Sequence, residues 1–188
     1  MNRDRQPSLD APLLANMLQE SLRHNQRPTL TISSDSMLPL LRRGDQVTLE
    51  PVAPAQLQPG DIITCLHNAH LLTHRYWDTA VSATQPHLHT RGDRSLQADA
   101  PTPTTDLIGR VTQRTRGKRT LSLQTGAGLW LNRALANLAR REWQWLANAA
   151  TPQPTWRVRA LHRAVLLYGS LLTWLAAAWA KKGVQRET

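Results

Sequence analysis

The stretch SDSMLPLLRRGD, residues 34–45, decides how the first half of this sequence is interpreted. It places two serines, a proline and a Gly-Asp pair directly after a β-branched run. Glycine and proline mark turns, so we expect a loop here that follows one strand and leads into another. The question is whether Ser36 is an ordinary loop residue or a nucleophile aimed at a substrate.

The sequence around this stretch, from Thr29 to Val111, has the pattern of β structure. Short apolar runs are separated by Gly-Asp, Asn-Ala, Gln-Pro and Arg-Gly-Asp turns at close intervals. Strands are predicted near residues 29–33, 46–51, 61–67, 71–77, 87–90 and 107–113. A further hairpin, TRGKRTLSL, is expected to turn at Gly117.

Helical patterns flank this β region on both sides. Residues 8–23 place leucines on one side of a short helix, and helix is again predicted beyond Gly128. In the second helix Leu131 and Leu135 lie on the apolar face, whereas Glu142 lies largely off it. The expected fold class is therefore mainly β, with a short N-terminal helix and a helical C-terminal appendage. The expected domain boundaries are 1–28 for the N-terminal helical segment, 29–128 for the β domain and 129–188 for the basic helical region.

Residues 164–180 contain no charged side chain. As a helix this segment would be roughly 26 Å long, just under the roughly 30 Å hydrocarbon core of a bilayer. With basic residues and Trp179 at its ends, it is expected to associate with a membrane as a single C-terminal helix. Because residues 1–28 lack a secretory h-region, the β domain is expected on the cytoplasmic side. In the alternative, the segment packs on the preceding helix in a hairpin, and the chain is soluble and cytoplasmic.

The formal net charge of +10 over 188 residues favours an anionic partner without identifying it. Cys65 is the only cysteine, which excludes an intrachain disulfide and a cysteine-based zinc site. No His-Glu-x-x-His string occurs, so no metal site is expected.

A serine nucleophile needs a neighbouring base. No lysine precedes Lys118, so a Ser-Lys dyad inside the β region is excluded. Histidine remains as the base, and strand alternation alone does not choose between His70 and His74. The other histidines of the β region are His67, His87 and His89.

Five sequence boxes together resemble the signal peptidase I and LexA-type serine peptidase superfamily. They are SMLPLLRRGD, PGDIITC, LLTHRYW, LHTRGDRSLQAD and DLIGRV, and they follow the family's order across residues 30–112. Bacterial signal peptidases and LexA-type repressors use lysine as the base. The pair His74-Arg75 instead resembles the archaeal and endoplasmic-reticulum type, which uses histidine.

This resemblance implies a role for each matching residue. Ser36 would be the nucleophile, His74 the general base and Asp99 the acid that orients the histidine. Ser34 would help to form the oxyanion hole, and Asp93 would shape and support its loop. Asp35 stands where glycine is common in the family, so its side chain either points away from the site or lowers activity.

The resemblance implies a serine endopeptidase that cleaves a peptide or protein precursor without a cofactor or a specific nucleic-acid partner. Two alternatives stay open. A LexA-like self-cleaving regulator would explain the basic charge, but only about 30 residues precede the β domain, too few for a helix-turn-helix module. A catalytically degenerate peptide-binding or membrane-scaffold protein would explain Asp35.

Overall fold

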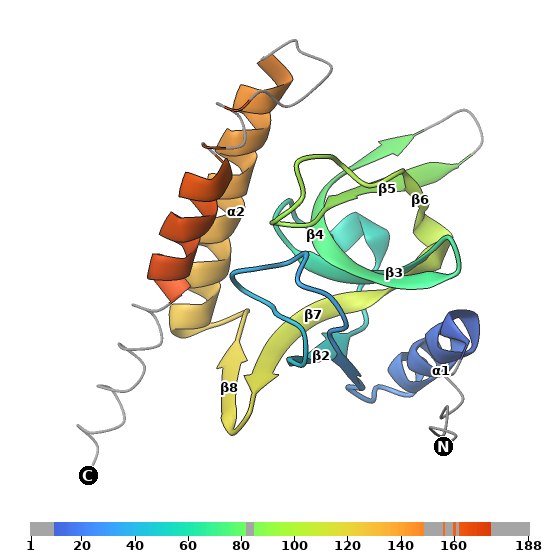
Figure 1. The fold of residues 1–188 in the computed structure, drawn as a ribbon. Helices are drawn as coiled ribbons and strands as arrows, with labels where there is room; N and C mark the ends of the chain where they lie inside the picture. The colour runs from blue at the N-terminus through green and yellow to red at the C-terminus, as the bar shows by residue number, and fades with distance from the viewer. Residues whose placement is uncertain (1–9, 82–84, 149–155, 157–159, 161, 174–188) are drawn as a thin grey trace, which may run out of the picture.

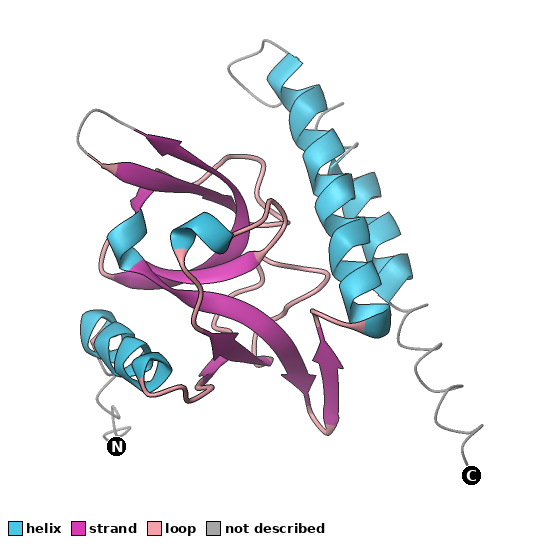
Figure 2. Ribbon diagram, turned by 180° about the vertical axis from the view of Figure 1, so that it is seen from behind, coloured by secondary structure: helices cyan, strands magenta, loops and turns pink. Residues whose placement is uncertain are grey.

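The computed structural model describes residues 10–81, 85–148, 156, 160 and 162–173, and for residues 145–148 it describes the helix backbone alone. A strongly curved antiparallel sheet forms the body of the molecule (Figure 1). Helix α1 (Ala11–Arg23) lies at one end of the sheet, and α2 (Gly126–Asn148) lies at the opposite end (Figures 1 and 2). The prediction of a mainly β fold with helices at both ends is confirmed.

The sheet is ordered β1-β2-β7-β3-β4-β5-β6, and β8 pairs with β7 outside this path. The strands are β1 (Thr29–Thr31), β2 (Gln46–Glu50), β3 (Ile62–His67), β4 (His70–Val81), β5 (Pro86–Arg91), β6 (Thr102–Pro103), β7 (Leu107–Arg116) and β8 (Arg119–Ser122). Short 3-10 helices lie at Pro54–Gln56 and Thr104–Asp106. The sequence did not predict β6, because its two residues pair only with the start of β5.

The predicted turns explain the strand pairs. Asn68 and Ala69 both have positive φ and join β3 to β4, as a two-residue hairpin turn requires. Gly117, at φ 59°, turns β7 into β8, so the hairpin expected around it is confirmed. In β3 the neighbours Ile62 and Ile63 belong to separate core clusters, because successive side chains point to opposite faces of the sheet.

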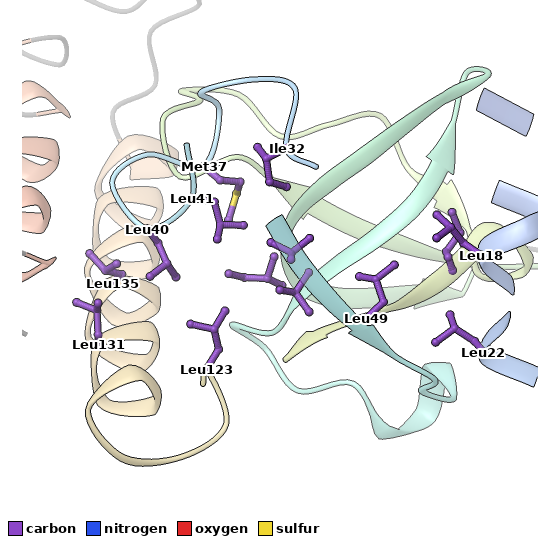
Figure 3. Close-up of a cluster of buried hydrophobic side chains, with 14 of the residues drawn as sticks. Leu18, Leu22, Ile32, Met37, Leu40, Leu41, Leu49, Leu123, Leu131 and Leu135 are labelled. Atoms are coloured by element: carbon purple, nitrogen blue, oxygen red, sulfur yellow. The ribbon is translucent and has the colours of Figure 1, made fainter. Parts of the chain in front are cut away.

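The larger core cluster joins the sheet to the helices at both ends. Leu18 and Leu22 of α1 are buried at one end (Figure 3). At the other end Leu131 and Leu135 of α2 point toward Leu40, which belongs to the loop after β1. These leucines are at most 5 % exposed, so α2 packs directly on the loop that carries Ser36.

The prediction of a membrane-spanning C-terminal helix is wrong. Within the described ranges, no helix has the length and apolar character needed to cross a bilayer. Residues 162–173, here called the C-terminal helix, run alongside α2 (Figures 1 and 2). They use one face for packing, since Gly169 is buried and Leu172 packs against the main core cluster. Residues 174–180 of the predicted span lie outside the described residues.

Candidate active site

The loop that carries Ser36, residues 34–45, is closed at its base by backbone hydrogen bonds. Ile32 donates its N–H to the Asp45 carbonyl, and Gly44 donates to the Ile32 carbonyl, both at 2.8 Å. Gly44 has a φ of +85°, which glycine adopts without strain. The Asp45 carboxylate, whose side chain is 1 % exposed, accepts Nε–H and Nη2–H of Arg116 at 2.7 Å each. This ion pair fixes the loop where it enters β2.

The charge of Asp45 is maintained by its neighbours. Burial alone would raise the pKa of this carboxyl. Hydrogen bonds from Arg116 and the Arg42 N–H, with the positive charges of Arg116 and Arg114, outweigh burial and hold the pKa below its ordinary value of 3.8. The same two arginines donate to the Leu40 carbonyl at 2.9 and 3.3 Å, so they bind the loop backbone as well.

The structure shows where the side chains of Asp35 and Ser34, the two residues before Ser36, are directed. Asp35 turns its carboxylate to the backbone of Arg43, whose N–H donates to Oδ1 at 2.9 Å. The Asp35 carboxylate is therefore bound to the loop backbone, which favours the alternative in which its side chain points away from the site. Ser34 places its Oγ 3.1 Å from the Oγ of Ser36, a position from which it can donate to charge that develops beside Ser36.

Ser36, His74 and Asp99 lie in one hydrogen-bonded chain. Ser36 Oγ is 2.8 Å from His74 Nε2, and His74 Nδ1 is 2.6 Å from Asp99 Oδ2. Thr90 also donates its hydroxyl to Asp99 Oδ2 at 2.7 Å. His70, the alternative base, is exposed at the start of β4, whereas His74 is only 6 % exposed. The structure thus brings together the three residues that the resemblance selected.

The partners of His74 determine which of its nitrogens carries the proton. A carboxylate only accepts hydrogen bonds, so Nδ1 donates to Asp99 and holds the proton of the neutral ring. The lone pair of Nε2 then faces the Ser36 hydroxyl. This tautomer, assigned from the partners, is the one that can remove a proton from Ser36, and the anion behind it stabilises the imidazolium that forms.

Asp93 has a structural part beside this chain. Its carboxylate accepts Nε–H and Nη2–H of Arg75 at 2.7 and 2.6 Å, and the Arg75 side chain is fully buried. Arg75 Nη1 also donates to the Gly60 carbonyl and to Asn132 Oδ1 of α2, both at 2.7 Å. Because Arg75 follows His74 directly in β4, these bonds fix the strand that carries His74. The supporting role expected for Asp93 is consistent with this geometry.

Sequence reasoning missed two residues that shape the site, Thr90 and Gly92. A Cβ added at Gly92 would lie 2.9 Å from the Ser36 carbonyl oxygen and 3.0 Å from His74 Nε2. Only glycine therefore lets this loop approach both residues so closely. The signal was present in the sequence, since Thr90 and Gly92 flank Arg91 in the box that contains Asp99.

Sequence reasoning also missed a buried polar cluster between the sheet and the helices. Arg91 Nη2 donates to Glu142 Oε2 at 3.2 Å and to the Ala139 carbonyl at 3.0 Å. His162 of the C-terminal helix pairs with the other oxygen of Glu142 through Nδ1. The helical pattern placed Glu142 off the apolar face. That prediction is wrong: Glu142 lies eleven residues, about three helical turns, after Leu131, so it is on the same side of α2, where it is 4 % exposed between Arg91 and His162.

The thiol of Cys65 is buried in the sheet. Burial, with a smaller contribution from the charge of Asp99, raises the pKa of the Cys65 thiol to about 12. A thiol that stays protonated is a poor nucleophile. Over the residues that the structure describes, no three His, Cys, Asp or Glu side chains are grouped as they would be around a metal ion.

Neither the protein-family models nor the curated protein sequences contain a match to this chain.

Proposed function

We propose that this chain is a serine endopeptidase, similar to signal peptidase I of the Ser-His type, that cleaves a peptide or protein precursor. The single observation that carries the proposal is the chain of hydrogen bonds from Ser36 Oγ through His74 to Asp99. Oriented, mutually hydrogen-bonded nucleophile and base side chains are the signature of covalent acyl transfer.

The proposed reaction has two halves. Ser36 Oγ attacks the carbonyl carbon of the scissile peptide bond while His74 Nε2 takes the hydroxyl proton. The tetrahedral oxyanion is stabilised by the Ser36 backbone N–H and the Ser34 hydroxyl, and His74 then gives its proton to the departing amine. Water, activated by His74, hydrolyses the acyl-enzyme, releases the new carboxyl terminus and restores Ser36.

An extended peptide fits the sheet beside this site. Residues 71–73 of β4 pair with β3 on one side, while β5 pairs with β4 only from Arg75 onward. In the described sheet, the second edge of β4 thus has no strand partner directly before His74. An open edge offers backbone donors and acceptors to a peptide that adds as a further strand, which favours a polypeptide substrate over a small ester.

Cleavage of a mixture of unstructured peptides, followed by mass spectrometry in ¹⁸O-labelled water, tests this proposal. Wild-type protein should give products with ¹⁸O in the new carboxyl terminus, and Ser36→Ala and His74→Gln should give none. Ser33→Ala, at an exposed neighbouring serine, is the matched control and should cleave like wild type. Equal cleavage by wild type and Ser36→Ala would contradict the proposal.

A further inference from the structure

The C-terminal helix is linked to the proposed nucleophile through a single residue of the loop after β5. His162 Nε2 lies 3.0 Å from the carbonyl oxygen of Arg94. Arg94 in turn donates its backbone N–H to the carbonyl oxygen of Ser36 at 2.8 Å. A side chain of the C-terminal helix therefore holds the peptide segment to which the Ser36 backbone is bound.

The hydrogen-bond partners of His162 both accept. Nε2 faces a carbonyl oxygen, and Nδ1 faces the carboxylate of Glu142. Glu142 is the anion that the fully buried Arg91 side chain requires, because a buried cation without a partner is strongly unfavourable. Only the imidazolium form has a donor on each ring nitrogen, so both bonds form together when His162 is protonated.

If the cluster served only to pack a helix, apolar side chains would serve as well or better. Replacing a buried ion pair by apolar side chains is often neutral or stabilising. Within the described structure, Nε and Nη1 of Arg91 are buried without a hydrogen-bond partner. The guanidinium also lies 4.9 Å from the centre of the Trp143 ring, which confines it further. What the cluster provides is a defined position for Arg91, and Arg91 directly precedes Gly92 beside the base.

A second contact links the same helix to the other side of the site. A Cβ added at Gly169 would lie 3.0 Å from Cγ of Pro39, which follows Ser36 in the nucleophile loop. The helix therefore contacts the nucleophile loop directly, and it contacts the loop after β5 through His162.

We infer that His162 is a positioning residue: by bridging Glu142 and the Arg94 carbonyl, it holds Ser36 at its distance from His74. This inference rests on the proposed function of Ser36. It assigns the C-terminal helix a part in completing the active site through the bonds of His162 to Glu142 and to the Arg94 carbonyl. Small displacements of a nucleophile lower rates by up to about 100-fold, so the loss of His162 should be visible in reactivity.

The test compares His162→Phe, which keeps a ring but loses both donors, with His162→Gln, whose amide keeps one donor. The matched control is His24→Phe, because His24 also pairs with a glutamate, Glu20 at 3.0 Å, but on the exposed surface of α1. Denaturant titration first establishes conditions under which all variants are folded. Two rates are then measured under these conditions: the hydrogen-exchange rate of the Arg94 amide, and the rate at which a fluorophosphonate probe phosphonylates Ser36.

We expect the Arg94 amide to exchange at least about 10-fold faster in His162→Phe, while the amide of Ile63 in β3 keeps its rate. Phosphonylation should slow by about 10- to 100-fold in His162→Phe and by less in His162→Gln, and His24→Phe should match wild type. Arg94 exchange that is unchanged, or that rises by the same factor as Ile63 exchange, would overturn the inference.

This design distinguishes a failure of the proposed function of Ser36 from a failure of the inference about His162. If wild-type Ser36 is not phosphonylated, the proposed function fails, and Arg94 exchange still decides whether His162 holds the loop. If His162→Phe does not fold, His162→Gln decides the question by the same comparison of Arg94 with Ile63.

Discussion

Replacing Asp99 by asparagine tests how the proposed site works, because it changes one oxygen of a carboxylate to an amide nitrogen with almost no change in shape. Asp99 Oδ2 accepts hydrogen bonds from His74 Nδ1 at 2.6 Å and from Thr90 Oγ1 at 2.7 Å. In the proposed reaction this anion stabilises the imidazolium that forms when His74 takes the Ser36 proton. The variant should fold normally and react slowly.

The expected loss in the peptide-cleavage rate has a lower and an upper bound. If the asparagine oxygen faces His74, the ring keeps its tautomer and loses only the charge-assisted part of the bond. A hydrogen bond to a charged group contributes about 1.5–3 kcal/mol, which corresponds to a loss of roughly 10- to 150-fold. If the amide N–H₂ faces His74, Nδ1 must accept, the proton moves to Nε2 and the base is lost. The loss then approaches the roughly 10⁴-fold typical of this change in a Ser-His-Asp triad.

The assay is the peptide-cleavage rate of the variant at matched concentrations of folded protein. Asp78→Asn is the control, because Asp78 pairs with His89 Nδ1 at 2.9 Å on the same sheet but outside the site. Thr90→Val, which removes the second donor to Asp99, should reduce the rate by a smaller factor than Asp99→Asn. A rate for Asp99→Asn within about threefold of wild type, with Ser36→Ala inactive, would refute the assignment of Asp99.

Three further predictions concern stability and reactivity. Asp93→Asn leaves the buried charge of Arg75 without its anion, so the free energy of unfolding in urea should fall by about 3–5 kcal/mol; an unchanged urea midpoint would contradict the structural role of this pair. Asp45→Asn removes an anion that is ionised in the folded state and bound by Arg116, and should cost about 1.5–3 kcal/mol at neutral pH. Because the folded-state pKa of Asp45 is lowered, its stabilisation is present above the ordinary value of 3.8 and is lost as pH falls through the folded-state pKa. The free energies of unfolding of wild type and Asp45→Asn should therefore become equal in acid. A difference between them that stays constant with pH would show that charge is not the cause. Cys65, with its pKa raised to about 12, should resist a thiol reagent at pH 8 until the protein unfolds, and rapid labelling of the native protein would count against its burial.

The strands could be predicted where turn residues and alternation agree. Asn68 and Ala69 interrupt two apolar runs, and β3 and β4 form on either side of them as expected. Strand β4 nevertheless continues to Val81, beyond the predicted end at residue 77, because β5 pairs with it along its second half. Local sequence contains no information about that partner, so the end of β4 could not be predicted from its own residues.

The candidate site, like the strands, could be predicted from the sequence only in part. Ser36 and His74 are 38 residues apart, and His74 and Asp99 are 25 apart, so spacing alone could not bring them together. The resemblance selected them through boxes that occur in a fixed order. Glu142 and His162 belong to no such box, and a charged residue beside arginines on a helix is usually solvated. Helical periodicity places Glu142 on the same side of α2 as Leu131, so its position could have been predicted, whereas the burial of His162 depends on how the C-terminal helix packs.

Covalent labelling tests whether Ser36 is a nucleophile activated by His74. Wild type, Ser36→Ala and His74→Ala are each incubated with a fluorophosphonate probe, and the intact mass and the labelled peptide are determined. We expect one probe per molecule of wild type, attached to Ser36, and no labelling of either variant. Equal labelling of all three proteins, or a folded wild type that stays unlabelled, would contradict this role of Ser36.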